Sequence, residues 1–224
     1  LVTQFSLDEA ASELSKITDI DPENFSDLSF KARALPIMNT IANEGFFADK
    51  IVVVEGTSDV GILWQIENLM GANWLEKGIV VVPANGKNNI DRPVVIFRGL
   101  SIPTYFIFDG DNKHQGKNNE DSTIRRNHRY LKLAGVPVED FPNTVINDSW
   151  AVFENNIEAE IKSAIGKEKY DDIRGEVAGL LGYDKPSHTI KNMYGASKLI
   201  EVIYERGLTV PVLEDLVKAI NSME

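Results

Sequence analysis

The sequence predicts an α/β fold with a mostly parallel sheet flanked by helices. Short runs rich in β-branched and aromatic residues, such as residues 51–54, recur along the chain, and a helical pattern follows each of the first three. These runs are apolar throughout, which is typical of strands buried on both faces. Strands that alternate with helices indicate crossover connections, and therefore parallel pairing of the strands.

Four strands are expected in this sheet. They cover residues 51–54, 79–82, 105–108 and either 144–146 or 150–153. Between them, helices are expected over about 58–70 and 90–99, and over a charged segment that ends near Gly135.

Helices are also expected at both ends of the chain. Ser6 is expected to cap the first helix, residues 21–24 to break it, and a second helix to run from about 29 to 43 with a kink at Pro36. Strand signals cease after Glu154. The remaining chain is expected to form short helices broken at Gly166, Gly182 and Pro186, followed by helices over 196–206 and 212–220.

Composition narrows the possible functions. The chain has 34 acidic and 23 basic residues, and its formal net charge of −11 argues against a simple basic nucleic-acid binder. The absence of cysteine excludes disulfides, thiolate catalysis and cysteine-ligated metals. No apolar run approaches the roughly 18 residues of a membrane span, and there is no signal-peptide pattern, so no membrane association and a cytoplasmic location are expected.

Carboxylates follow three of the expected strands. Glu55 and Asp59 follow the first strand, Asp109 and Asp111 the third, and Glu154 the last. Because the carboxyl ends of parallel strands share one edge, these side chains are expected to lie together. Crowded carboxylates repel one another unless a cation neutralises them, and Mg²⁺ with carboxylate ligands suits phosphate chemistry. Asp-Gly-Asp alone is a common turn, so it is the joint placement that favours a metal site.

Basic residues are expected beside this site. Lys198 opens a late helix, where it would offset charge on a phosphoryl group, although a lysine there is more often a surface residue. Lys87 follows the second strand, and residues 113–132 carry a local excess of positive charge. The candidate contacts to a DNA backbone are Lys87, Lys113, Arg125, Arg126 and Arg129. A solvated helix face explains the basic segment equally well.

Together these residues resemble a known domain. A glutamate after the first strand and Asp-x-Asp after the third resemble the Toprim domain. Residues 42–61 look like the junction between the ATPase and Toprim domains of the OLD (overcoming lysogenization defect) family. The resemblance continues through four short motifs, at residues 85–88, 108–111, 153–157 and, more weakly, 195–198.

This resemblance implies a Toprim fold with an inserted helical subdomain. It divides the chain into an N-terminal helical segment (1–45), a first Toprim part (46–155), a helical insert (156–194) and a last Toprim part (195–224). OLD proteins also carry an N-terminal ABC-type ATPase. The chain, which begins at Leu1, is therefore expected to be a C-terminal piece of a longer protein that forms a homo-oligomer at full length.

The resemblance further implies a metal-dependent DNA endonuclease with two Mg²⁺ or Mn²⁺ ions. The carried-over metal ligands are Glu55, Asp59, Asp109, Asp111 and Glu154, and the catalytic residues are Glu55, Asp109 and Lys198. Lys191 is a nearby competitor for the role of Lys198. Bound divalent ions would invert the sign of the local field, so the acidic composition does not exclude DNA as a partner.

Two alternatives stay open. The segment around Asp109 also resembles the motif of haloacid-dehalogenase-type phosphatases, in which the first aspartate is the nucleophile, although that motif normally follows the first strand. The second alternative is a non-catalytic Toprim-like module for DNA binding or assembly. That function does not require five carboxylates.

Overall fold

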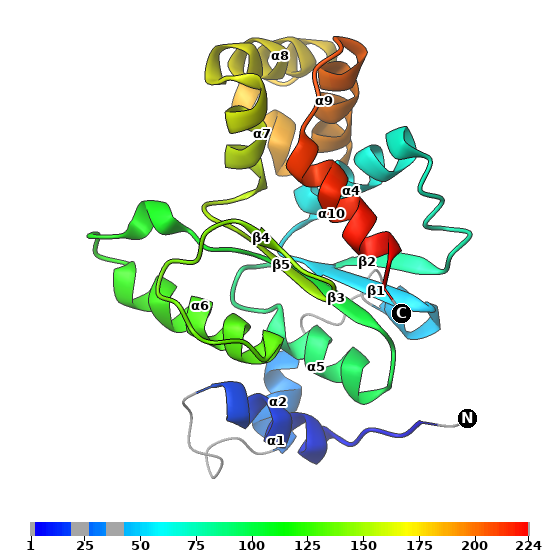
Figure 1. Cartoon of the computed structure of the whole chain (residues 1–224), viewed down its shortest axis with the longest axis vertical. Helices are drawn as coiled ribbons and strands as arrows, with labels where there is room; N and C mark the ends of the chain where they lie inside the picture. The colour runs from blue at the N-terminus through cyan, green and yellow to red at the C-terminus, as the bar shows by residue number, and fades with distance from the viewer. Residues whose placement is uncertain (1–2, 19–26, 35–42, 224) are drawn as a thin grey trace.

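A mostly parallel sheet lies at the centre of the molecule (Figure 1). The computed structural model describes residues 3–18, 27–34 and 43–223. Within these residues the sheet has five strands in the order β2-β1-β3-β5-β4. The strands are β1 (Lys50–Val54), β2 (Ile79–Pro83), β3 (Thr104–Asp109), β4 (Val145–Ile146) and β5 (Trp150–Phe153).

The predicted α/β fold is confirmed. The pairs β1–β2, β1–β3 and β3–β5 are parallel, while the short edge strand β4 is antiparallel to β5. Both candidate segments for the fourth strand form strands in the structure. Residues 145–146 run antiparallel to residues 151–152 and pair with them.

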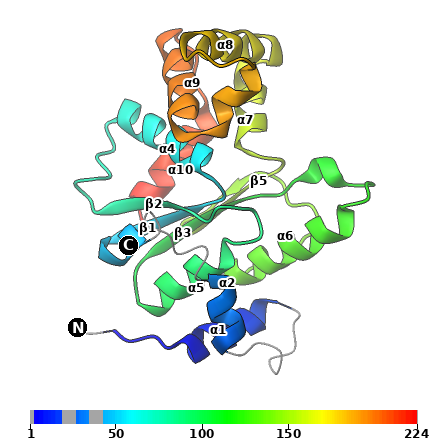
Figure 2. The same cartoon turned by 180° about the vertical axis from the view of Figure 1, so that it is seen from behind.

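Side chains alternate between the two faces of β1 and so build two cores. Val52 and Val54 join a cluster that includes residues of α4 (Thr57–Met70), α9 (Met193–Glu205) and α10 (Pro211–Asn221). Ile51 and Val53 face the opposite side, where α5 (Asp91–Gly99) and α6 (Glu120–Ala134) pack. Helices therefore cover both faces of the sheet (Figure 2), as continuously apolar strands require.

The N-terminal helices pack on the outer side of α5. In α1 (Leu7–Ile17), the Ser6 hydroxyl accepts a hydrogen bond from the Glu9 N–H at 3.2 Å, and the Glu9 carboxylate accepts one from the Ser6 N–H at 2.7 Å. This capping box confirms Ser6 as the N-cap. The second helix, α2, spans Asp27–Ala34. The expected break at 21–24 and the kink at Pro36 lie outside the described residues.

Beyond β5 the chain is helical, as expected. The elements are α7 (Ile157–Ile165), α8 (Lys167–Leu180) and the 3-10 helix η4 (Pro186–Lys191), followed by α9 and α10. Gly166 separates α7 from α8 with a φ of 86°, and Pro186 begins η4. The predicted insert boundaries at 156 and 194 stay a prediction. Among the described helices, none is both long enough and apolar enough to cross a membrane.

Close packing of α4 against α9 predicts a sharp cost for one small substitution. A Cβ at Gly61 would lie 2.0 Å from the Met193 carbonyl oxygen, a backbone atom that cannot move without shifting α9. Gly61→Ala is expected to lower the free energy of unfolding by about 1–3 kcal/mol, measured by urea denaturation. The matched control is Gly175→Ala on α8, where a Cβ meets nothing within 4 Å. It should be neutral or stabilising, and an equal loss in both variants would contradict this account.

Candidate metal centre at the carboxyl edge of the sheet

Three predicted metal ligands line one small cavity at the carboxyl ends of β1 and β3. Glu55, Asp59 and Asp109 share this cavity of about 170 Å³. The parallel register pairs Val53 with Phe106, so the residues that follow the two strands emerge side by side. The first turn of α4 contributes Asp59. Its carboxylate accepts a hydrogen bond from the Gly56 N–H at 2.9 Å, which turns it back towards the strand ends.

Charge is unfavourable in this cavity, as the pKa values of its carboxyl groups indicate. Burial, reinforced by the neighbouring Asp59 and Asp111, raises the pKa of Glu55 to about 7. Burial likewise raises the pKa of Asp59 to about 6, against the opposing hydrogen bond from Gly56. For Asp109, burial and the nearby Glu55 raise the pKa well above its ordinary value. A bound cation would relieve this repulsion.

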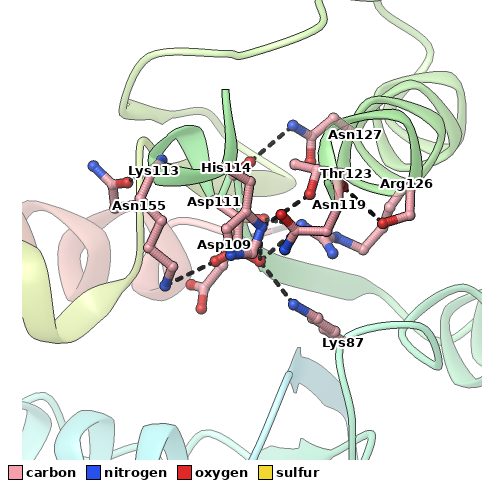
Figure 3. A network of polar contacts seen from close by, with 12 residues as sticks. Lys87, Asp109, Asp111, Lys113, His114, Asn119, Thr123, Arg126, Asn127 and Asn155 are labelled. Carbon is pink, nitrogen blue, oxygen red and sulfur yellow. Dashed lines mark hydrogen bonds and ion pairs between the residues drawn. The ribbon is translucent and has the colours of Figure 1, made fainter. Parts of the chain in front are cut away.

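Asp111, although only two residues from Asp109, lies in a different environment. It is buried, and it forms ion pairs with Lys87 (3.1 Å), Lys113 (3.0 Å) and Arg126 (2.9 Å) (Figure 3). Burial alone would raise the pKa of Asp111, but the hydrogen bonds from Lys113 and Lys87 and the nearby charges outweigh it, so the pKa is lowered. The two aspartates of the motif therefore have opposite electrostatic surroundings.

Backbone contacts fix the Asp109–Asp111 turn against β5. The Gly110 N–H donates to the Phe153 carbonyl at 2.8 Å, and the Asn112 N–H donates to the Glu154 carbonyl at 3.0 Å. A Cβ at Gly110 would come within 2.8 Å of that Glu154 carbonyl oxygen, so the turn requires glycine. On the other side, the buried Asn127 amide of α6 donates to the Gly110 carbonyl at 2.9 Å.

Two other predicted site residues lie outside the cavity. The Glu154 side chain is exposed and lines a separate depression with Lys113 and Asn155. Lys198 forms an ion pair with Glu201 of its own helix at 3.0 Å and is not among the residues that line the cavity. Its competitor Lys191 is exposed at the end of η4 and does not line the cavity either.

The five candidate DNA contacts differ in accessibility. The side chains of Lys87 and Lys113 are 42% and 47% exposed, and Arg125 is exposed on α6. Arg126 is only 4% exposed and bonded to Asp111, so it serves as internal support and cannot reach a DNA backbone. Arg129 pairs with the buried Asp91 at 3.4 Å and lies over the Tyr130 ring, which leaves it largely enclosed.

Sequence reasoning missed the opposite wall of the cavity. Glu158 and Tyr170, from α7 and α8, line it together with Ile161. The Tyr170 hydroxyl donates to the Glu158 carboxylate at 3.0 Å, and Lys162 pairs with the same oxygen at 2.6 Å. The N-cap at Asn156 places Glu158 in the first turn of α7, next to the end of β5. An asparagine that follows the last strand and precedes a helix is visible in the sequence, so the position of Glu158 in the first turn could have been predicted.

The donor set fits a hard divalent cation. Among the residues that the structure describes, no group of three or more acidic or histidine side chains is arranged so that it could hold a metal ion without rearrangement. The cavity nevertheless offers carboxylate oxygens from Glu55, Asp59 and Asp109, the ligand type that Mg²⁺ and Mn²⁺ prefer. Burial and mutual repulsion raise the pKa values of these groups, and a bound divalent cation would offset both effects.

One segment of the chain matches a known family model. Residues 46–111 match the family model described as overcoming lysogenization defect protein-like, Toprim domain. This segment contains Glu55, Asp59, Asp109 and Asp111. The resemblance to an OLD-type Toprim domain is therefore confirmed for this part of the chain.

Solved structures of OLD proteins share the fold. The C-terminal region of the Xanthomonas campestris pv. campestris OLD protein, phased with platinum, is 18% identical with a TM-score of 0.52, over 80% of this chain and 94% of that one. The C-terminal region of the Burkholderia pseudomallei OLD protein is 17% identical with a TM-score of 0.51, over 78% of this chain and 98% of that one. At such identities the likeness establishes the fold alone. No curated protein matches the chain.

The raised pKa of Glu55 predicts a specific pH dependence of stability in metal-free buffer. Between its ordinary value of 4.5 and about 7, the folded state holds more protons than the unfolded state, so stability falls as pH rises through this window. Glu55→Gln removes this contribution to the pH dependence. The free energy of unfolding of the variant should fall less steeply with pH and, at about pH 8, should exceed that of the wild type by roughly 1–3 kcal/mol. Urea denaturation with EDTA across this pH range measures the effect.

The control for this pH experiment is Glu76→Gln. Glu76 is exposed, so this variant should show the same dependence of the free energy of unfolding on pH as the wild type. A Glu55→Gln profile as steep as that of the wild type would contradict the assigned repulsion.

Proposed function

We propose that this chain is the catalytic region of a divalent-metal-dependent DNA endonuclease, which hydrolyses phosphodiester bonds at the cavity between β1, β3 and α7. The observation that carries the proposal is the convergence of Glu55, Asp59 and Asp109 on one cavity with pKa values raised by burial and mutual repulsion. The match to an OLD-like Toprim domain supports the same reaction class.

In this proposal Glu55, Asp59 and Asp109 hold Mg²⁺ or Mn²⁺, two ions in the family's arrangement. Bound divalent ions supply Lewis-acid chemistry, lowering the pKa of a water and neutralising charge on the phosphate and leaving oxygen. Because the pKa values of these three carboxyl groups are raised, binding a cation would be coupled to release of protons.

The helical wall of the cavity has a separate role. Ile157, Ile161 and Ile190 line the cavity together with Glu158 and Tyr170. The apolar side chains of this wall would displace water around the reacting phosphate and strengthen the electrostatic interactions within the site. Because this wall comes from the helices that follow β5, the helical insert would take part in the reaction.

DNA is the proposed substrate, and the proposed setting is a longer chain. Lys87, Lys113 and Arg125 present accessible positive charge near the turn that carries Asp109. The structures that share the fold are themselves C-terminal regions of OLD proteins, which supports an N-terminal ABC-type ATPase as partner and regulator. The net charge of −11 implies that DNA binding depends on metal and weakens with salt.

Removal of the cavity carboxylates should abolish cleavage. In a plasmid nicking assay with Mn²⁺ or Mg²⁺, Glu55→Gln and Asp109→Asn are each expected to lower the rate by on the order of 100-fold or more, because each removes a charge that holds the cation. Glu76→Gln, a matched substitution at an exposed site, should cut like the wild type. Undiminished cleavage by both cavity variants would sink the assignment. DNA binding without cleavage at any metal concentration would favour a non-catalytic module.

A further inference from the structure

A second hollow adjoins the turn after β3 and is rich in side-chain amides. It has a volume of about 540 Å³, within the range of roughly 300–1,000 Å³ that is usual for small-molecule sites. Its walls come from three segments, which are the turn after β3, the loop between α6 and β4, and the end of β5. Four of its lining residues carry an amide: Asn112, Gln115, Asn143 and Asn155. We call this hollow the amide depression.

The amide depression lies directly beside the acidic cavity, because the chain passes from one to the other at two places. Asp109 lines the cavity and Asn112 lines the depression, while Asn156 lines the cavity and Asn155 the depression. Three residues of chain span at most about 11 Å. Successive bases of a stacked strand are about 3.4 Å apart. A strand cut in the cavity would therefore bring a nucleotide within about three positions of the cut to the depression.

Hydrogen bonds between the three segments fix the walls of the depression. The Asn112 side-chain amide donates to the Pro142 carbonyl at 3.2 Å, and the Asn112 N–H donates to the Glu154 carbonyl at 3.0 Å. The Lys113 N–H donates to the Asn155 side-chain oxygen at 2.8 Å, and these two residues lie side by side next to the turn (Figure 3). Because the walls are already tied together, binding a ligand here costs little conformational entropy.

Several amide groups of the depression are available to a ligand. The side chains of Gln115 and Asn143 are exposed and form no hydrogen bond within the described part of the chain. Asn155 uses its side-chain oxygen for Lys113, which leaves its NH₂ group. An amide offers both donors and an acceptor, the combination that matches the edge of a nucleobase. The half-buried Phe141 adds an aromatic side chain on which a base can stack.

The charges around the depression favour an uncharged ligand. Its lining contains one basic and one acidic side chain, Lys113 and Glu154, so its formal charge is zero. The Lys113 ammonium group is already paired with Asp111 at 3.0 Å. A phosphate in the depression would meet the Glu154 carboxylate, whereas a base carries no charge. The lining therefore suits the base of a nucleotide better than its phosphate.

We propose that the amide depression binds an unpaired base of the DNA strand that is cut in the acidic cavity. Gln115 and Asn143 select the base by hydrogen bonding, and Phe141 stacks on its face. An unpaired base exposes both its face and its pairing edge, which a base inside a duplex does not. This inference rests on the proposed function in taking DNA as the ligand. It goes further by making binding depend on the identity of a base close to the cut.

Affinities for strands of different composition test this base subsite. Fluorescein-labelled oligo-dA, oligo-dT, oligo-dC and an alternating dG/dT strand of equal length are titrated with the protein in Ca²⁺ and followed by fluorescence anisotropy. Gel electrophoresis checks that the strands stay intact. The affinities of the wild type should span about fivefold or more, because hydrogen bonds to a base edge discriminate between bases. Equal affinity for all four strands, or no detectable binding, would overturn the inference.

Variants of the lining residues locate the source of the preference. Gln115→Ala and Asn143→Ala should each at least halve the ratio between the tightest and the weakest affinity, and the double variant should bring it to about 1. Asn68→Ala, at an exposed residue of α4, is the matched control and should keep the ratio of the wild type. An unchanged ratio in the double variant, or an equal loss of affinity for all four strands, would overturn the selecting role.

The stacking role has its own variant. Phe141→Leu keeps an apolar side chain but removes the aromatic face, so it should weaken all four affinities by about fivefold or more and leave their ratio in place. Unchanged affinities would remove Phe141 from the subsite. Thermal unfolding of each variant checks that it is folded.

Competition with free deoxynucleoside monophosphates separates a base within a strand from a free nucleotide. A monophosphate should displace the labelled strand only weakly, because the strand also contacts the protein outside the depression. Displacement by a monophosphate that binds as tightly as the strand would make this a nucleotide site and overturn the inference. The binding ratios need no cleavage. A protein that fails the nicking assay but loses its base preference in the variants would refute the endonuclease and keep the base subsite.

Discussion

Like-charge repulsion at the carboxyl edge of the sheet is the constraint on which the site depends. Parallel pairing of β1 with β3 brings Glu55 and Asp109 to one edge, and the first turn of α4 adds Asp59. Burial in a small cavity makes each negative charge more costly, so the pKa of every one of these groups is raised. Packing elsewhere in the fold offsets this cost, including the close contact between α4 and α9 at Gly61.

The turn after β3 places its two aspartates in opposite electrostatic environments within three residues. Asp109 stays in the cavity with the other carboxylates, while Asp111 turns away to Lys87, Lys113 and Arg126. Gly110 makes this possible because the turn passes too close to the β5 backbone for any side chain. The turn therefore connects an acidic cavity with a cluster of three protein cations.

The sheet could be predicted from the sequence because most of its strands are continuous apolar runs. The meeting of the strand-end carboxylates could also be predicted, because parallel strands place their carboxyl ends at one edge. The sequence was not sufficient for partners that only tertiary structure brings together. The pairing of Asp111 with Arg126 depends on how α6 crosses the sheet, and both residues have ordinary surface roles when read alone. The outward orientation of Glu154 and the pairing of Lys198 within its own helix were hidden for the same reason. Glu158 was missed because its place in the cavity wall depends on how α7 and α8 pack after β5.

The central claim is that the cavity lined by Glu55, Asp59 and Asp109 binds the catalytic cation. The most direct measurement is a crystal structure of the protein soaked in Mn²⁺, with the ion located by its anomalous scattering. The expected result is Mn²⁺ in the cavity, in contact with Glu55 and Asp109. A protein that cleaves DNA but holds no ion in this cavity would contradict the claim.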